Sequence, residues 1–429
     1  MLKFILLLKY NFFFFPLLFF FSHILALFNI KVRKGLQGRY LTLIQTKDFA
    51  SHTPDNAAII LFHCASMGEF EHIKPLIPIL KEKQEQIKIV VMFFSPSGYE
   101  NVKTFRGVDL FIYSPFDWWF PVRRFYKLLN PEVVIFAKHD VWPNLVWVAR
   151  REGIPSFLIN ASLHDTSSRV KGLSRLIHQA IYSDLTKIIT ISEKDGENFK
   201  TLVPGNKIFV AGDTKYDQVL FRVRESREKV LLPAKIYEGK TVFVAGSTWP
   251  EDLENLLPAL KNVLAGVNDF FVIICPHEPT PSHIKQLQEL LSPISIILYS
   301  NVEDHKNESI LVIDAIGLLA TIYSVAQIAY VGGSFKQNVH NVLEPAAYGI
   351  PVLFGPVNHN SHEAQVLKEE GAGIEVDGPE VIQKTLEKLI KEKELREKMG
   401  EKAVNIVRQN SGATTRTLDV ILPYLSDND

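Results

Sequence analysis

The most suggestive carboxylate in this chain of 429 residues is Glu69, which follows a glycine at the point where an apolar run stops. Residues 61–77 read LFHCASMGEFEHIKPLI, so a helical pattern resumes soon after Ser66. A carboxylate at the end of a buried strand can accept a proton from a substrate hydroxyl, and Gly68 lets a ligand approach the backbone. The alternative is a plain helix start, in which Ser66 caps the helix and Glu69 favours its dipole. The residues alone leave both interpretations open.

A second group of unusual residues lies within residues 330–356, YVGGSFKQNVHNVLEPAAYGIPVLFGP. Gly332, Gly333 and Ser334 close a strand without bulk, which predicts exposed backbone N–H groups able to bind a phosphate. Glu344 precedes a proline that suits the first turn of a helix, and its carboxylate could hydrogen-bond a ribose diol. A pair of ordinary turns is the alternative, but the combination favours a nucleotide site.

Two further strand ends carry polar residues. In AGSTWPED, residues 245–252, a strand is followed by Ser247 and Thr248 and then by an acidic first turn. These hydroxyls either cap the helix or contact a phosphate. In CPHEPTP, residues 275–281, His277 is either a ligand contact or a loop histidine.

Charged residues also end a strand in FAKHDVWPNLV, residues 136–146, which contains Lys138, His139 and Asp140. Three polar residues there are more than a turn requires. In GDTKYD, Lys215 lies at the junction of the two halves of the chain, where a cation could meet a phosphate.

Several kinds of site are absent from the sequence. No G-x-G-x-x-G follows a strand, there is no P-loop and no H-E-x-x-H, and the 13 histidines show no metal-ligand spacing. We therefore expect neither a metal nor a cofactor. Lys and Arg total 47 and Asp and Glu total 47, which argues against a nucleic-acid partner. Two cysteines, Cys64 and Cys275, exclude a disulfide framework and indicate a reducing compartment.

These polar residues follow short apolar runs that alternate with amphipathic stretches. Continuously apolar runs indicate strands buried on both faces, and strands spaced by helices indicate a parallel sheet. The first series is AAIILFHC, IKIVVMFF, VDLFIY, EVVIFA, IPSFLIN, TKIITI and NKIFVAG, and the second is KTVFVAGS, DFFVIIC, ISIILY, SILVIDA, IAYVGGS, IPVLFG and GAGIEV. We predict an α/β protein with two doubly wound, Rossmann-like domains that bind ligands beyond the carboxyl ends of their strands, in a cleft between the halves.

The predicted boundaries follow the composition, since a chain of this length exceeds one ordinary core. They are an anchor at 1–30, a first domain at 31–215, a linker at 216–239 containing RVRESREK, a second domain at 240–405, and a C-terminal helix and tail at 406–429.

The anchor prediction rests on residues 11–30, NFFFFPLLFFFSHILALFNI, which carry no charge and can cross about 30 Å of hydrocarbon. The basic residues that follow are Lys31, Arg33, Lys34 and Arg39. This cluster predicts that the rest of the chain stays in the cytoplasm, and it would attract an anionic lipid surface. A cleaved signal peptide is disfavoured because no small-residue cleavage site is present, whereas a shallow, monotopic insertion stays open.

Together, these segments resemble the 3-deoxy-D-manno-octulosonic acid (Kdo) transferases of lipopolysaccharide biosynthesis. The matching segments follow the family's order and are HCASMGEFEHIKPLI, FFSPSGYENV, YSPFDWWFPVRRF, VWPNLVWVARREGIP, INASL, GDTKYD, AGSTWPED and VGGSFKQNVHNVLEPAAYGIPVLFGP. The resemblance covers nearly the whole chain, to about Leu425. Its most specific parts are the S-x-G-E turn and the H-N-x-L-E-P-A segment.

The resemblance implies a metal-independent GT-B glycosyltransferase tethered to the cytoplasmic side of the inner membrane. It would move Kdo from CMP-Kdo to the 6′-hydroxyl of a tetraacylated lipid A precursor, lipid IVA, with inversion. The first domain would bind the acceptor and the second CMP-Kdo. The basic cluster from Lys31 to Arg39 would attract the phosphates of the acceptor as well as the lipid surface. Glu69 matches the family's catalytic base, and Asp140 and Lys215 match transition-state helpers. The residues that match CMP contacts are Pro276, His277, Ile316, Gly317, Leu318, Asn341, Val342, Leu343 and Glu344.

The chain departs from the family at several of these positions. His277 and Glu278 follow Pro276 where Arg-His is usual, so one cationic phosphate contact is missing or replaced. Leu318 stands in place of an acid, NVHN from Asn338 replaces GGHN, and KHDVWPN replaces ETELWPN.

Two other functions fit the same pattern. One is a GT-B transferase that uses a UDP-sugar and a lipid carrier, and the other is a membrane-tethered nucleotide-binding module without catalysis. Protection from thermal unfolding by uridine rather than cytidine nucleotides would identify the first alternative. Absence of CMP release from CMP-Kdo in the presence of acceptor would identify the second.

Overall fold

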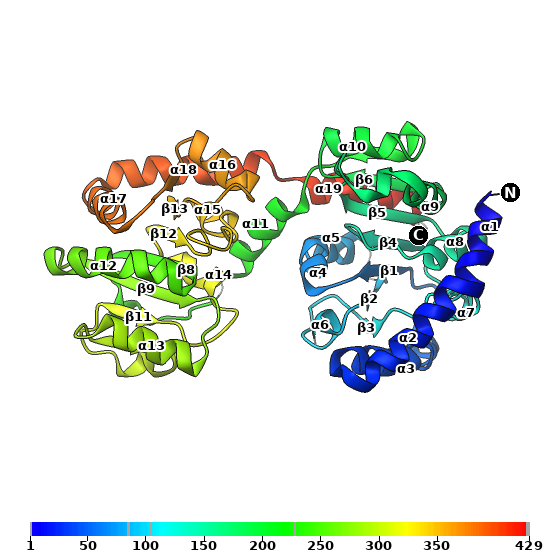
Figure 1. The fold of residues 1–429 in the computed structure, drawn as a ribbon, viewed down its shortest axis with the longest axis horizontal. Coiled ribbons are helices and arrows are strands. Elements are labelled where there is room, and N and C mark those ends of the chain that lie inside the picture. The colour runs from blue at the N-terminus through cyan, green and yellow to red at the C-terminus, as the bar shows by residue number, and fades with distance from the viewer. Residues whose placement is uncertain (1, 84–85, 103, 227–228, 426–429) are drawn as a thin grey trace. The chain divides into compact units, whose positions relative to one another are not determined.

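The computed structural model describes residues 2–83, 86–102, 104–226 and 229–425, and the chain divides into two compact units (Figure 1). The first unit comprises Met1–Gln218 with Ser411–Asp429, and the second comprises Val219–Asn410. Each is built on a seven-stranded sheet in which all neighbouring strands are parallel. The predicted fold class of two doubly wound domains is therefore confirmed.

In the first unit, each predicted apolar run forms a strand. In spatial order the strands are β3 (Leu110–Tyr113), β2 (Lys88–Phe93), β1 (Ile59–Cys64), β4 (Val133–Ala137), β5 (Ser156–Ala161), β6 (Lys187–Thr190) and β7 (Ile208–Val210). The strand order reverses between β1 and β4, and ligands of doubly wound sheets bind at such a switch point.

The continuous apolar runs supply two cores because alternate side chains point to opposite faces of the sheet. Ile59 and Leu61 pack into one core, and Ile60 and Phe62 into the other. Helices that contribute to the first core are α7 (Trp119–Leu129), α8 (Pro143–Glu152), α9 (Gly172–Tyr182) and α10 (Glu193–Lys200). Helices that contribute to the second are α4 (Met67–Ile73), α5 (Leu76–Lys83) and α19 (Ala413–Ile421).

The second unit repeats this plan. In spatial order its strands are β10 (Ile296–Leu298), β11 (Ile310–Val312), β9 (Phe270–Pro276), β8 (Thr241–Thr248), β12 (Ile328–Val331), β13 (Val352–Phe354) and β14 (Gly373–Glu375). Its helices are α12 (Pro250–Gly266), α13 (Pro281–Leu291), α14 (Leu319–Ile322), α15 (Leu343–Ala347), α16 (His362–Glu369), α17 (Pro379–Lys391) and α18 (Lys393–Gln409). Here the switch point lies between β8 and β12.

Two segments differ from the boundaries that composition predicts. The segment 216–239 begins within a helix, α11 (Thr214–Ser226), and the boundary between the units falls inside that helix because it buries Tyr216 as well as Val219 and Val223. The segment 406–429 is also divided. Its first residues end α18, and α19 then packs Leu418 and Ile421 into a core of the first unit. The last residues of that segment, 426–429, lie outside the described residues.

The N-terminal apolar segment is helical throughout. It consists of α1 (Leu2–Lys9), a π-helical turn (Tyr10–Phe14) and α2 (Phe15–Phe28), and it is followed by α3 (Ile30–His52) (Figure 1). The 26 residues from Lys3 to Phe28 are long and apolar enough to cross a membrane. Asn29 separates α2 from α3, and its side chain caps α3 by accepting the N–H groups of Lys31 and Val32.

Candidate functional site

In the first unit, the three predicted catalytic residues follow the carboxyl ends of strands in one sheet. Glu69 follows β1, Asp140 follows β4 and Lys215 follows β7. Because the strands are parallel, these ends share one edge of the sheet. Glu69 and Asp140 thus flank the switch point.

Glu69 is a buried carboxylate in the first turn of α4, and it is only 9 % exposed. Its Oε2 accepts the N–H of Ala65, whereas the side chain of Ser66, the residue that precedes the helix, makes no capping hydrogen bond. The serine cap considered from sequence is therefore wrong, because the glutamate itself bonds an amide of the turn.

Burial raises the pKa of Glu69 to about 7. The negative charge of Asp140 raises it further, whereas the Ala65 N–H and the positive charge of Lys138 oppose the rise. A carboxylate with this pKa is near the optimum for a general base at neutral pH.

Asp140 and Lys138 lie on the turn after β4. The indole N–H of Trp142 donates to Asp140 Oδ2 at 3.2 Å. Lys138 has a φ of 61°, in the left-handed region that a side chain with a Cβ rarely adopts. Its backbone is held there by donation of its N–H to Ile159 O at 2.9 Å. Such strain is common at functional sites.

Lys215 begins α11 beside an acid of its own turn. Its Nζ lies 3.3 Å from Asp213 Oδ2, and its backbone N–H donates to Asp213 Oδ1 at 2.9 Å. The positive charge is thus partly balanced within the protein.

His72 is a further polar residue at this edge that sequence reasoning missed. Its Nδ1 lies 3.2 Å from Asn160 Nδ2 and 3.3 Å from Thr214 Oγ1. Burial lowers the pKa of His72 to about 4, with help from the positive charge of Lys138, so the ring is neutral at pH 7. Its spacing of three residues from Glu69, which places both on one helix face, is the signal that could have revealed it.

In the second unit, the glycine turn after β12 makes contacts that differ from those predicted. The Gly332 N–H donates to Gly246 O and the Gly333 N–H donates to Asp252 Oδ2 at 2.8 Å. Ser334 is fully buried, and its hydroxyl accepts the Gly355 N–H at 2.6 Å. The predicted phosphate nest at Gly332 and Gly333 is therefore wrong, because both amides already bond protein oxygens.

Close packing explains these two glycines instead. A Cβ on Gly332 would lie 2.3 Å from Ser247 O, and one on Gly333 would lie 2.3 Å from Asn338 O. Gly333 also has a φ of 83°, which favours glycine.

The turn after β8 leaves one hydroxyl without a partner. The residue that caps α12 is Trp249, whose N–H donates to Asp252 Oδ2 at 2.8 Å, so neither Ser247 nor Thr248 is the cap. Thr248 is 3 % exposed, and its Oγ1 has no hydrogen-bond partner among the described residues. A buried hydroxyl of this kind is available to a ligand or a water.

Three aromatic rings stack beside that hydroxyl. The His277 ring lies 4.6 Å from the rings of both Trp249 and His340, and the Trp249 indole N–H donates to His340 Nε2 at 2.9 Å. Sequence reasoning missed Trp249 and His340.

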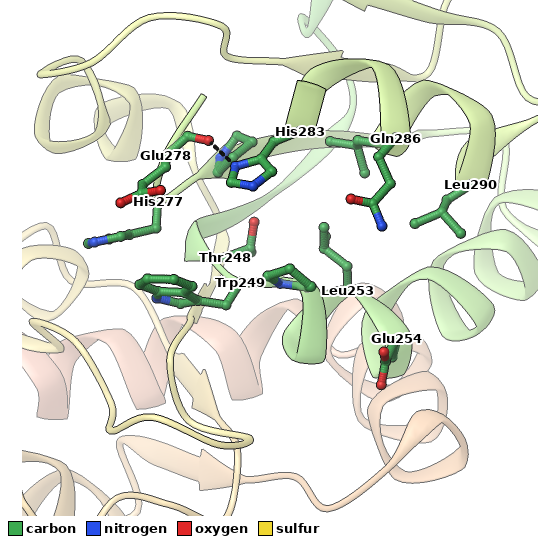
Figure 2. A pocket seen from close by; sticks show the side chains of 12 residues that line it. Thr248, Trp249, Leu253, Glu254, His277, Glu278, His283, Gln286 and Leu290 are labelled. Atoms are coloured by element: carbon green, nitrogen blue, oxygen red, sulfur yellow. Dashed lines mark hydrogen bonds between the residues drawn. The ribbon is translucent and has the colours of Figure 1, made fainter. Parts of the chain in front are cut away.

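A cavity of about 140 Å³ adjoins this stack. Figure 2 shows the Thr248 side chain between Trp249 and His283. The lining residues are Thr248, Trp249, Pro250, Leu253, Glu254, Pro276, His277, Glu278, His283, Gln286, Leu287 and Leu290. Three predicted donor-binding residues, Thr248, Pro276 and His277, are thus brought together.

The other predicted donor-binding residues do not line this cavity. Ile316 is 81 % exposed, Gly317 follows it with a φ of 83°, and Leu318 is half-buried where α14 begins. They lie on the loop after β11 and are accessible from solvent.

The segment before α15 also contains residues that are already engaged. Asn341 is exposed, and its Oδ1 accepts the Leu343 N–H at 3.1 Å. Val342 and Leu343 are buried in the core, so only their backbone could meet a ligand. Glu344 forms an ion pair with Arg222 of α11. The carboxylate that was predicted to hydrogen-bond a ribose is therefore already engaged.

Comparison with known proteins covers both units. Residues 37–218 match a family model described as 3-deoxy-D-manno-octulosonic-acid transferase (kdotransferase). The 3-deoxy-D-manno-octulosonic acid transferase of Aquifex aeolicus is 30 % identical over 338 residues, 78 % of this chain and 87 % of the relative. The chain belongs to the Kdo transferase family. The 3-deoxy-D-manno-octulosonic acid transferase of Haemophilus influenzae is 29 % identical over 378 residues, which cover 86 % of this chain and 88 % of that relative.

Solved structures show that this Kdo transferase family member shares the GT-B fold. The UDP-GlcNAc 2-epimerase of Neisseria meningitidis matches with a TM-score of 0.59 and 17 % identity, covering 85 % of this chain and all of the epimerase. A glycosyltransferase from Rickettsia africae matches with a TM-score of 0.54 and 13 % identity, covering 87 % of this chain and all of the glycosyltransferase. At these identities the likeness concerns the fold alone.

The basic cluster of this Kdo transferase family member is only partly free for a membrane. Lys31 and Lys34 are exposed. Arg33 donates to the carbonyls of Ala26 and Leu27 and so satisfies the end of α2. Arg39 turns inward and donates to Phe94 O at 2.6 Å, so it is separated from the exposed Lys31 and Lys34.

No group of three or more His, Cys, Asp or Glu side chains that could hold a metal occurs in the part of the chain that the structure describes.

Proposed function

We propose that this protein transfers Kdo from CMP-Kdo to the 6′-hydroxyl of a lipid A precursor, with inversion at the anomeric carbon and without a metal or other cofactor. Membership of the Kdo transferase family supports the choice of sugar. The chemistry of Glu69 supports the choice of mechanism.

The observation that carries the proposal is a buried carboxylate at the switch point of the first unit, with a pKa of about 7. At neutral pH about half of such groups are ionised and can accept a proton. Asp140 contributes by raising the basicity of Glu69 through its negative charge.

In the proposed step, the 6′-hydroxyl oxygen attacks the anomeric carbon of Kdo while its proton passes to Glu69. A new C–O bond forms as the bond between the anomeric carbon and the CMP phosphate oxygen breaks. The electron pair of that bond leaves with CMP. Attack opposite to the leaving group gives inversion, and a phosphate is a sufficiently good leaving group for a single displacement.

Within the proposal, the second unit binds the donor. Thr248 supplies a hydroxyl that has no partner among the residues the structure describes, and the stacked rings of Trp249 and His277 supply a flat apolar surface beside it. Lys215 of the first unit, partly neutralised by Asp213, would assist where negative charge develops.

The proposal includes attachment to the cytoplasmic face of the inner membrane through α1 and α2. Its support is the apolar helix from Lys3 to Phe28, most of whose residues are not buried. An embedded acceptor would then be met in two dimensions rather than in three.

The decisive experiment is incubation of the full chain with CMP-Kdo and tetraacylated lipid A precursor, followed by mass spectrometry of the lipid. We expect the mass of the lipid to rise by one or more Kdo residues and CMP to be released. An unmodified lipid under conditions in which CMP protects the protein from thermal unfolding would contradict the proposal. Protection by UDP but not CMP would indicate a different donor.

A further inference from the structure

The first unit contains a cavity on the side of α2 and α3 that is larger than the cavity beside Trp249 in the second unit. It has a volume of about 330 Å³ and lies between these helices and the turns that follow β2 and β3. Its walls are mainly apolar and include Leu18 and Phe19 of α2, Val32 of α3 and Phe116. We call it the α2–α3 groove. Its size falls in the range of about 300–1,000 Å³ that is usual for small-molecule sites.

Polar contacts fix the apolar helix to the domain and so give the groove a stable wall. The Tyr10 hydroxyl donates to Asp117 Oδ2 at 2.7 Å. Asn11, which is 6 % exposed, donates to Asn144 Oδ1 at 3.1 Å and accepts the Trp118 indole N–H on its carbonyl at 3.1 Å. Buried polar groups with matched partners hold a single arrangement.

The helix that lines the groove also exposes apolar side chains. Several aromatic residues of the helix are largely exposed, among them Phe12 at 70 %, Phe13 at 74 % and Phe28 at 84 %. Exposed apolar side chains that cluster in this way along one helix typically contact lipid or another protein. Because the groove is lined by residues of the same helix, an occupant that enters from this surface is most simply a lipid chain.

A positive charge lies inside the groove. The Arg39 guanidinium stacks 4.5 Å from the centre of the Phe94 ring and donates to the carbonyls of Gly35 and Phe94. It forms no ion pair with any carboxylate that the structure describes. Burial lowers the pKa of Arg39 to about 10, which leaves it charged at neutral pH.

The other charged residues of the lining agree with an anionic occupant. Lys31 is exposed and adds a second positive charge. Asp117 is the one acid in the lining, and its two oxygens already accept donors from Tyr10, Asn144 and Leu145.

The inner end of the groove lies beside the proposed catalytic residues. Trp142 lines the groove, stacks on Phe94 with ring centres 4.6 Å apart, and donates its indole N–H to Asp140. The charge of Asp140 in turn acts on Glu69. Trp142 and Asp140 thus connect the groove with the proposed base.

We propose that the α2–α3 groove binds one acyl chain of the lipid acceptor, and that Arg39 and Lys31 bind an anionic group of its head. This inference rests on the proposed function and identifies the acceptor subsite. It explains how a lipid hydroxyl reaches Glu69 while most of the lipid stays in the membrane. Each methylene buried in the groove would contribute about fourfold in affinity.

The test compares two neighbouring leucines of α2. Leu18 lines the groove and is 39 % exposed, whereas Leu17 does not line it and is 57 % exposed. Leu18→Trp fills the groove, and Leu17→Trp adds the same bulk outside it. Each variant is assayed with tetraacylated lipid A precursor in detergent and with the deacylated, phosphorylated disaccharide, and the thermal unfolding temperature of each is measured.

We expect Leu18→Trp to raise the KM for the acylated acceptor at least about tenfold, the effect of losing two or more buried methylenes. Its KM for the deacylated acceptor and for CMP-Kdo should stay native, as should all values of Leu17→Trp. Val32→Trp, on the opposite wall, should reproduce the result. An unchanged KM for the acylated acceptor, or an equal loss on both acceptors, would overturn the proposal.

Two further arms separate the remaining explanations. Arg39→Gln should raise the KM for the phosphorylated acceptor but not for its dephosphorylated form, and an equal loss on both would refute the role of the charge. If Leu18→Trp weakens binding to phosphatidylglycerol vesicles but leaves the acceptor KM unchanged, the groove holds bulk lipid and the proposal is wrong. Failure of the native protein to modify either acceptor would instead refute the proposed function itself.

Discussion

Each unit carries an acid in the first turn of the helix that follows its first strand, and the two acids have different surroundings. Glu69 of α4 accepts one hydrogen bond from the residues that the structure describes, from the Ala65 N–H. Asp252 of α12 accepts three, from the N–H groups of Trp249 and Gly333 and from the Tyr330 hydroxyl. The two acids hold the same topological position, but Glu69 has one hydrogen-bond donor and Asp252 has three.

The number of donors explains what each acid can do. A carboxylate that accepts several hydrogen bonds, as Asp252 does, holds its donors in place. A buried carboxylate with a single donor keeps a raised pKa and can exchange a proton with a ligand. The first unit is therefore suited to proton transfer, and the second to positioning.

The largest effect on turnover is expected from replacing Glu69. Glu69→Gln should lower kcat for Kdo transfer by about 10²–10⁴-fold, since the amide accepts no proton from the attacking hydroxyl. CMP should protect the variant from thermal unfolding as it does the native chain. Glu71→Gln, on the same helix, is the control and should keep near-native turnover. More than a tenth of native turnover in Glu69→Gln would disprove the role of base.

The same substitution in the second unit should affect stability instead. Asp252→Asn replaces one acceptor oxygen by an NH₂ group that faces donors, so we expect a loss of about 3 kcal/mol in the free energy of unfolding. For a unit of this size that corresponds to a fall of roughly 6–12 °C in its unfolding temperature. Glu251→Gln, which breaks a surface pair with Lys336, should cost about 1 kcal/mol or less. Equal urea midpoints for the two variants would contradict the structural role of Asp252.

The pH dependence sharpens the contrast. Because Glu69 must be ionised to act, kcat/KM should fall about tenfold per pH unit below a midpoint near pH 7. Removing the negative charge in Asp140→Asn should move this midpoint to lower pH, and removing the positive charge in Lys138→Met should move it to higher pH. Shifts of the same sign in both variants would be incompatible with electrostatic control of Glu69.

The smallest effect concerns stability. A carboxyl whose folded pKa exceeds its unfolded value favours folding when protonated, and this contribution disappears as the pH rises through the folded pKa, here about 7. Glu69→Gln should therefore unfold at a higher temperature relative to native protein at pH 8 than at pH 5. A difference between the two proteins that does not change with pH would argue against a buried, raised carboxyl.

Sequence patterns predicted the strands well because a continuous apolar run between turns has few other uses. They failed where hydrogen-bond partners are distant. Gly332 and Gly333 were predicted to offer free amides, but the Gly333 amide bonds Asp252, 81 residues away. Arg39 was grouped with three other basic residues, but Phe94, 55 residues away, accepts its guanidinium N–H and turns it into the first unit. The stack of Trp249, His277 and His340 likewise joins three separate turns.

By itself, the sequence determined the two series of parallel strands, the apolar N-terminal helix and the acid that follows the first strand, because each depends on local spacing and composition. The tertiary structure alone decided which acid keeps a raised pKa, which amides stay free and which basic residue turns into the groove. Those properties depend on burial and on partners that only folding brings within hydrogen-bonding distance.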